Sequence, residues 1–169
     1  MITIRRMTEE DAGQAAVLEA DNFSEPWTES AFLETLCLDY AYYYVAETDD
    51  GMEGLTQKTE EKPVKKQKRI VGVCGLRKLA GEGEITNVSV DRDYRRKGIA
   101  AALLGHTLKE GEKLGIEAFT LEVRIGNLPA ISLYEKFGFM GEGVRRGFYK
   151  ASTERGKECR EDALIMWKR

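Results

Sequence analysis

The sequence predicts a single α/β (α+β) domain spanning residues 1–169, with a mixed, mostly antiparallel sheet of about six to seven strands and helices on both faces. Segments rich in Val, Ile and Tyr outnumber those with helical periodicity. Only the second half of the chain alternates strand and helix, the order that favours parallel pairing. A length of 169 residues also suits one domain with its own core.

The chain is expected to begin with a short strand and two helices. Residues 2–6 alternate as a strand does. Thr8 can cap a following helix, with Asp11 as its capping-box partner. The segment 23–27 breaks that helix, and Thr28 begins a second one.

Two strands rich in Tyr and Val are expected next, at 42–47 and 70–79, and a third at 84–90. The stretch between the first two, 48–68, has very few large apolar residues and many Lys and Glu. Because such a stretch cannot bury itself, it is predicted to be a polar, flexible loop insertion, and no function is assigned to it.

The second half of the chain is expected to carry two helices and the rest of the sheet. A helix over 98–114 shows one apolar face and stops at Gly115. Asn127 caps a shorter helix that Gly138 ends. The remaining strands are expected at 118–123, 139–145 and 163–167.

Composition limits the partners. The formal net charge is only −3, so no global field attracts nucleic acid or a membrane. The apolar stretches are too short to span a bilayer, and residues 1–6 lack the apolar core of a signal peptide. Three cysteines without a CxxC pair favour reduced thiols in the cytoplasm. A cytoplasmic protein is therefore expected, and we also predict a monomer without a bound metal.

The single histidine and the cysteines argue against several kinds of catalytic site. His106 is the only histidine, which disfavours a histidine-based triad and a multi-histidine metal site. It falls at the edge of a helical apolar stripe and is expected to be a half-exposed packing residue. Cys37 and Cys74 have apolar neighbours and are expected in the core rather than as catalytic thiols.

A candidate anion site lies in the turn before the helix at 98–114. Gly98 and Ala100 leave space above the backbone, where unpaired amides and the helix dipole attract a phosphate or pyrophosphate. Basic residues at a helix N-terminus oppose the dipole, so three in succession favour a bound anion; an ordinary solvated basic turn is the alternative. The three are Arg95, Arg96 and Lys97. Neither a GxGxxG nor a P-loop pattern is present.

Two signatures, in the expected order and spacing, resemble those of the GNAT superfamily of acetyltransferases. The first resembles its coenzyme A pyrophosphate loop and runs over 88–100, with Gly98 at its centre. The second resembles its N…A…LYEKxGF pattern and runs over 127–139. The resemblance implies a GNAT-like fold and acetyl-CoA as co-substrate. The residues that it implies for acetyl-CoA binding are Val88, Ser89, Val90, Arg95, Arg96, Lys97, Gly98, Ile99, Ala100 and Asn127.

Further segments resemble the bacterial ribosomal-protein-alanine N-acetyltransferases. They are residues 23–27, 84–90, 121–124, 146–149 and 161–166. The resemblance covers nearly the whole chain except 48–68, which is longer than that family usually carries, and Gly126 stands where the family commonly has Ser. It implies direct acetyl transfer to the α-amino group of the N-terminal alanine of a small-subunit ribosomal protein, without an acyl-enzyme.

The same resemblance implies the catalytic roles. Glu122 is the candidate general base, directly or through water, and Tyr134 the candidate general acid toward the coenzyme sulfur. Backbone N–H groups near Val88 and Val90, where parallel strands of this superfamily splay apart, are expected to stabilise the carbonyl charge. An outward strand carboxylate and a packed tyrosine ring are the ordinary alternatives for the two side chains.

A peptide slot is expected beside this chemistry. Its candidate residues are Phe23, Pro26, Trp27 and Tyr149, with Glu84 at its end to hold the substrate ammonium. Ordinary loop anchoring explains the same aromatic residues equally well. A carboxylate base favours an α-amino group over lysine, because neutralising lysine at pH 7 costs roughly 3 kcal/mol more. An acetyltransferase of a small-molecule amine and a non-catalytic coenzyme A-binding module are the two other functions considered.

Overall fold

The computed structural model describes residues 1–49, 68–154 and 157–169. The strands are β1 (Ile2–Arg6), β2 (Ala41–Thr48), β3 (Arg69–Leu79), β4 (Glu82–Val90), β5 (Ala118–Arg124), β6 (Met140–Glu154) and β7 (Lys157–Lys168). The helices are η1 (Glu9–Asp11), α1 (Ala12–Asn22), α2 (Glu29–Leu36), η2 (Arg92–Tyr94), α3 (Ile99–Lys113) and α4 (Leu128–Lys136). The predicted fold class is confirmed, and the predicted elements form in the predicted order.

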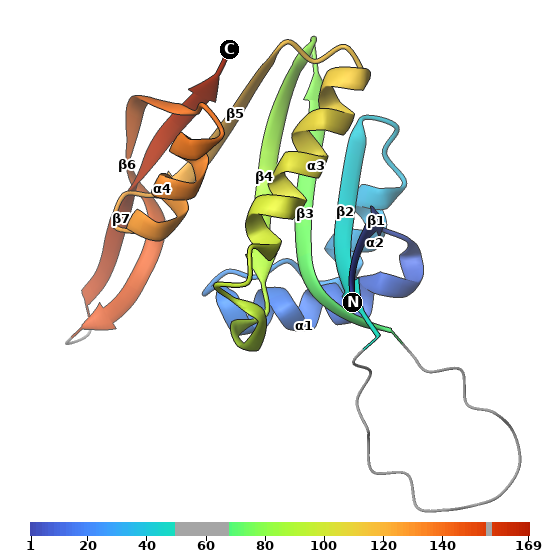
Figure 1. The fold of residues 1–169 in the computed structure, drawn as a ribbon. Helices are drawn as coiled ribbons and strands as arrows, with labels where there is room; N and C mark the ends of the chain where they lie inside the picture. The colour runs from blue at the N-terminus through green and yellow to red at the C-terminus, as the bar shows by residue number, and fades with distance from the viewer. Residues whose placement is uncertain (50–67, 155–156) are drawn as a thin grey trace, which may run out of the picture.

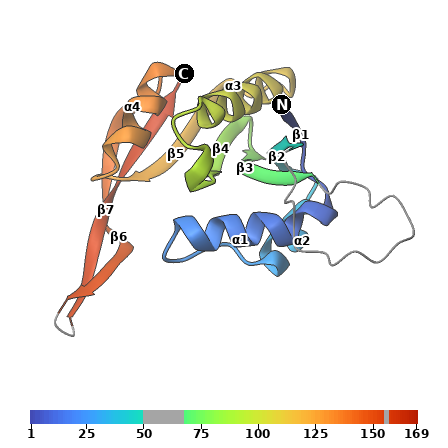
Figure 2. The ribbon, with the colours of Figure 1, turned by 60° about the horizontal axis from the view of Figure 1, so that its bottom comes forward.

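The strands form one seven-stranded sheet in the order β1-β2-β3-β4-β5-β7-β6. All neighbouring strands are antiparallel except β4 and β5, which are parallel. The helices α1 and α2 cover one face, and α3 and α4 the other (Figures 1 and 2). Each face has its own buried cluster, with Leu103, Leu121 and Tyr134 on the α3/α4 side and Phe32 and Tyr43 on the α1/α2 side.

The parallel pair separates halfway along its length. β4 and β5 pair only from Glu82–Ala118 to Ile85–Leu121, and beyond this point the two strands diverge (Figure 1). On the other side of β4, Leu76 is level with Ile85 but Gly75 is level with Asn87. Thr86 is therefore an extra, bulged residue, and a bulge bends and twists its strand. We call the separated ends, residues 86–90 of β4 and 122–124 of β5, the divergence.

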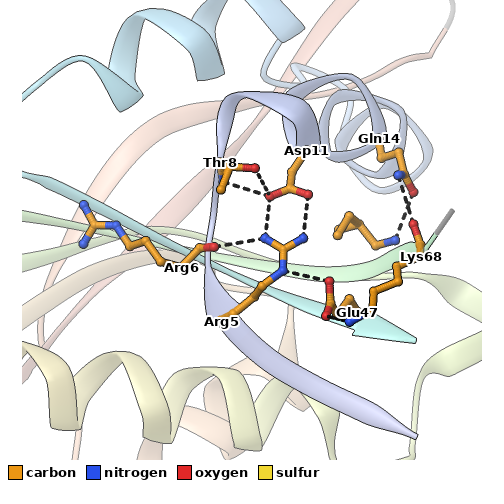
Figure 3. Close-up of polar contacts among 8 residues, drawn as sticks. Arg5, Arg6, Thr8, Asp11, Gln14, Glu47 and Lys68 are labelled. Atoms are coloured by element: carbon orange, nitrogen blue, oxygen red, sulfur yellow. Dashed lines mark hydrogen bonds and ion pairs between the residues drawn. The ribbon is translucent and has the colours of Figure 1, made fainter. Parts of the chain in front are cut away.

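The N-terminal segment is held to the sheet by a partly buried polar cluster (Figure 3). The Arg5 guanidinium donates to both oxygens of Asp11 at 2.7 and 2.9 Å and to Glu47 at 2.7 Å. The backbone N–H of Thr8 donates to Asp11 at 2.8 Å, which confirms the predicted capping box. Lys68 also pairs with Glu47, at 2.6 Å. These contacts fix the start of α1 against β1 and β2.

Three sequence-based boundaries are wrong. Thr48 does not open the polar loop but ends β2, where it is buried and pairs with Ile2 and Arg69; residues 50–67 of the predicted insertion lie outside the described residues. The last two strands extend well beyond 139–145 and 163–167. They form a hairpin at the sheet edge, where backbone pairing rather than apolar alternation carries the strand, so the added residues give little pattern.

The cysteine prediction is half right. Cys74 is buried, as expected, but Cys37 is exposed because it is the C-cap of α2 and lies past the apolar face of that helix. His106 is half-buried and packs edge-on against Tyr44, with ring centroids 4.9 Å apart, as expected. Among the described residues, no helix is both long and apolar enough to cross a membrane.

Candidate active site

The N-terminus of α3 is open to a ligand. Gly98 is its N-cap, with the left-handed φ of 79° that glycine tolerates best, and it makes no side-chain cap. A Cβ added there would meet nothing within 4 Å, so the space above the backbone is free. The side chain of Ile99 is buried in the core, which leaves only its amide to contribute beside that of the half-buried Ala100. Uncapped amides at a helix N-terminus suit an anion.

The three basic residues before α3 divide into two kinds. The Arg95 guanidinium donates to the side-chain oxygen of Asn22 and to the carbonyl of Val90, so it fastens the turn to α1. Arg96 and Lys97 are exposed, with the Lys97 ammonium 4.7 Å from the ring centroid of Tyr94. The structure therefore places two cations beside the open helix end and gives the third a bracing contact.

Backbone amides of β4 face the divergence. The N–H of Asp91 donates to the Val71 carbonyl of β3 at 2.9 Å. Because N–H groups alternate in direction along an antiparallel strand, the amide of Ser89 also faces β3, whereas those of Val88 and Val90 face the side where β5 has separated. Such amides can bind a carbonyl oxygen that gains negative charge. The buried Ser89 hydroxyl accepts from Asn22 instead, at 2.7 Å.

The two predicted catalytic side chains start from opposite faces of the sheet. Leu121 and Val123 of β5 pack in the cluster under α3 and α4, so strand alternation places Glu122 on the α1/α2 side. Tyr134 of α4 lies in that cluster, with its ring centroid 6.0 Å from that of Phe139. The structure therefore puts the two side chains on opposite faces of the sheet, and their meeting at the divergence stays a prediction.

The Tyr134 hydroxyl is a neutral, unused donor. It has no hydrogen-bond partner in the part of the chain that the structure describes, although the residue is only 8% exposed. Burial, with smaller contributions from Cys74 and Tyr149, raises the pKa of Tyr134 above its ordinary value of about 10. The phenol therefore keeps its proton throughout the neutral range and can donate it.

The Glu122 carboxylate is reachable and already holds a cation. Its side chain is 24% exposed, and one oxygen lies 3.0 Å from the Arg145 guanidinium of β6. Arg145 is itself half-exposed and stacks on Phe148, 4.9 Å from the ring centroid. Burial first, and the negative charge of Glu122 second, raise the pKa of Tyr149. The arrangement can bind an ammonium group and accept its proton.

The loop at 23–27 and the β6–β7 hairpin come together over β5. Arg124 donates to Ser24 at 3.2 Å, and its guanidinium lies 4.5 Å from the Tyr149 ring centroid. Lys150 and Glu25 form an ion pair at 3.5 Å. Two elements distant in sequence therefore lie on either side of Arg124.

The other predicted substrate residues differ in their exposure. Phe23, 38% exposed, and Pro26 are free to contact a substrate. Trp27 is half-buried on Phe32 and Tyr43, with ring centroids 5.4 and 5.7 Å away, so it does anchor its loop.

Glu84 and Asn127 lie at the margins of the site. Glu84 is exposed on the paired part of β4, level with Thr120, and among the described residues it makes no hydrogen bond or ion pair with the other predicted site residues. The Asn127 side chain accepts from the Ala130 N–H at 3.3 Å, which confirms it as the cap of α4.

Sequence reasoning missed two bracing residues and one charged partner. Asn22 bridges to Ser89 and Arg95 across more than 60 positions, and Arg145 meets Glu122 from another strand. No local pattern marks such contacts. Arg124 does have a signal, since it ends the resembling segment at 121–124.

Comparisons with known proteins agree with this geometry. Residues 14–139 match the model of the Acetyltransferase (GNAT) family. A Bacillus subtilis protein, provisionally named a ribosomal protein bS18-alanine N-acetyltransferase, is 31% identical over 97% of this chain and 93% of its own length. The crystal structure of the Escherichia coli ribosomal-protein-S18-alanine N-acetyltransferase superposes with a TM-score of 0.78 at 30% identity, covering 99% of this chain and 93% of that one. Arabidopsis thaliana NAA60 in complex with acetyl-CoA shares the fold, with a TM-score of 0.76 at 17% identity over 99% and 97% of the two chains.

Proposed function

The chain belongs to the Acetyltransferase (GNAT) family and is an acetyl-CoA-dependent N-acetyltransferase, and from this premise we propose that its substrate is the α-amino group of the alanine that begins ribosomal protein bS18. One observation supports the proposal: a reachable carboxylate, Glu122, and a buried neutral phenol, Tyr134, lie on opposite faces of the same sheet. Similarity to the two bS18-alanine acetyltransferases over nearly their whole lengths supports this substrate.

The donor side is built by α3 and β4. The uncapped amides at Gly98, Ile99 and Ala100, with the Arg96 and Lys97 side chains beside them, hold the pyrophosphate of acetyl-CoA. Arg95 secures the turn that carries them. The amides of Val88 and Val90 face the divergence and bind the thioester carbonyl as it gains negative charge. Ser89 holds the β4 backbone to Asn22 of α1, and Asn127 caps α4.

The acceptor side is built by β5 and its neighbours. The substrate ammonium replaces the Arg145 cation at Glu122, which takes one proton directly or through a water molecule. The neutral nitrogen then attacks the thioester carbon and forms the C–N bond. As the C–S bond breaks, Tyr134 gives its proton to the departing thiolate, and the new amide nitrogen releases its second proton to water, from which the Tyr134 phenolate is reprotonated. No acyl-enzyme forms.

Peptide binding is assigned to the junction of the 23–27 loop with the hairpin. Phe23, Pro26 and the exposed edge of Trp27 form one wall, and Tyr149 forms the other. Glu84 lies on the same side of the sheet as Glu122 and adds negative charge near the incoming ammonium. An α-amino group suits this site. Because its pKa is near 8, removing its proton at neutral pH costs much less free energy than removing the proton of a lysine.

We also propose the wider setting in which the protein acts. The whole chain, residues 1–169, acts as one catalytic domain, in the cytoplasm and as a monomer. A formal net charge of −3 supports the view that it binds neither nucleic acid nor a membrane surface by charge.

Mass spectrometry of acetylated peptides tests the proposal. The protein and acetyl-CoA are incubated with a peptide that starts with Ala and contains one internal lysine, and with the same peptide blocked at its N-terminus. One added acetyl group on the first peptide, and none on the second, is expected. Equal acetylation of both, or faster acetylation of free polyamines or aminoglycosides, would overturn the assigned substrate in favour of a lysine or small-amine acetyltransferase. Absence of transfer to any amine would indicate a coenzyme-binding module.

A further inference from the structure

A buried polar network runs from α1 across the β4 bulge to β2, beneath the proposed site. Glu19, only 2% exposed, accepts from the Asn87 side-chain amide at 3.0 Å and from the backbone N–H of Trp27. The Thr86 hydroxyl donates to the Asn87 side-chain oxygen at 2.9 Å. Since that proton is used, the Tyr43 hydroxyl donates to Thr86, at 2.7 Å. Every donor in the network therefore points, step by step, toward Glu19.

The network fills its space tightly. A Cβ on Gly75 of β3 would come within 2.4 Å of Thr86, Asn87 and Tyr43, so only glycine fits beneath the bulge. Glu19 has no cation beside it among residues 1–49, 68–154 and 157–169. Burial raises its pKa, while the hydrogen bonds from Asn87 and Trp27 act in the opposite direction. A buried acid without an ion-pair partner costs stability, and groups of this kind concentrate at functional sites.

The two groups that Glu19 binds belong to the two sides of the reaction. Asn87 stands between the bulged Thr86 and Val88, whose amide faces the divergence. Trp27 ends the loop that carries Phe23 and Pro26. One carboxylate thus holds the donor-side strand and the acceptor-side loop in a common frame.

We propose that Glu19 is a positioning residue for acetyl transfer, which sets the alignment of the acceptor amine with the thioester by tying the 23–27 loop to the β4 bulge. This inference rests on the proposed function. It assigns to Glu19 no contact with either substrate. Misplacement of reacting groups by about 1 Å lowers rates by about 10²-fold, so the loss of this tie should be visible in kcat.

A charge swap tests the proposal without removing hydrogen bonds. Asn87→Asp alone places two carboxylates at a contact that is now 3.0 Å, and is expected to lower kcat by about 10- to 100-fold. The double variant Glu19→Gln/Asn87→Asp restores every bond: the new amide donates to Asp and accepts from Trp27, and Asp accepts from Thr86. Recovery of kcat to within about threefold of the parent protein is expected, with acetyl-CoA affinity unchanged throughout.

Glu47→Gln provides the matched control. Glu47 is also a buried glutamate, 3% exposed, but it lies on β2 in the cluster with Arg5 and Lys68. This variant is expected to lose thermal stability and to keep its kcat. Circular dichroism and melting curves place all assays below the lowest melting temperature.

Each outcome decides between a positioning role and a merely structural one. A folded double variant that regains kcat supports the proposal, whether or not the single variant folds. Unaltered kcat in a folded Asn87→Asp variant, no recovery in a folded double variant, or unfolding of both overturns it. The parent protein is assayed first with the Ala peptide; if it acetylates another amine instead, the proposed substrate fails and the same ratios are read with that amine.

Discussion

Replacing Tyr134 by Phe should separate catalysis from stability more cleanly than any other single change in the site. The hydroxyl makes no hydrogen bond within the described part of the protein, and the ring keeps its edge-on contact with Phe139 at 6.0 Å. A typical hydrogen bond contributes about 1 kcal/mol to stability, and here none is lost. The free energy of unfolding should therefore change by less than about 0.5 kcal/mol.

The effect on turnover should be far larger. A general acid contributes about 10²- to 10⁴-fold to the rate, which corresponds to roughly 3–5 kcal/mol of transition-state free energy at 1.36 kcal/mol per tenfold. The Tyr134→Phe variant should thus lose at least about 10² in kcat while binding acetyl-CoA as before. Because burial raises the pKa of Tyr134, deprotonation of this residue should not lower the kcat of the parent protein below about pH 10.

The assay must avoid thiol reagents, because exposed cysteines of the protein itself would react with them. Chromatographic measurement of acetylated peptide gives kcat, and denaturant titration gives the free energy of unfolding. Two results refute the reasoning. A kcat equal to that of the parent removes the acid role, and a stability loss above about 1 kcal/mol shows that the hydroxyl has a hidden partner.

Three further predictions follow from the described contacts. Glu122→Gln should lower kcat by about 10²- to 10⁴-fold and leave acetyl-CoA affinity intact, as measured by calorimetry; an unchanged rate removes the base role. Burial raises the pKa of the Cys74 thiol to about 12, so a maleimide should label only the two exposed cysteines of the folded chain and all three after denaturation. Burial alone would raise the pKa of Asp11, but hydrogen bonds from Arg5 and Thr8 outweigh it and hold that pKa below 3.8. The lowered pKa adds stability that is complete above about pH 4 and is lost as the pH falls through the folded-state value. Asp11→Ala should therefore lower the free energy of unfolding by about 2 kcal/mol at neutral pH and by nearly nothing in strong acid. Denaturant titration at both pH values measures the two differences.

Local chemistry explains what the sequence could predict. Caps depend on residues within one turn, and Thr8, Thr28 and Asn127 all begin helices as expected. The open helix end at Gly98 is likewise a property of a few adjacent residues. Apolar alternation identified most strands, because those strands have at least one buried face.

Contacts between distant strands explain what it could not. The bulge at Thr86 exists only relative to β3, since it is a mismatch of register and not a local signal. The long hairpin of β6 and β7 pairs through its backbone at the sheet edge, where polar residues carry no strand pattern. The ion pair of Glu122 with Arg145 joins different strands, so the sequence around either residue does not predict its partner.

The opposite origins of Glu122 and Tyr134 give the divergence its chemical meaning. In the structure β5 stands between the two side chains, so the proposed base and the proposed acid act from different faces of the sheet. Figure 2 shows α1 and α2 on one face of the sheet and α3 and α4 on the other, so the 23–27 loop lies on the face of Glu122 and α3 lies on the face of Tyr134. In the proposed mechanism each side chain therefore serves only the reactant on its own face. In that mechanism the amine and the thioester meet where β4 and β5 have parted, and the bulged Thr86 lies at the start of that gap.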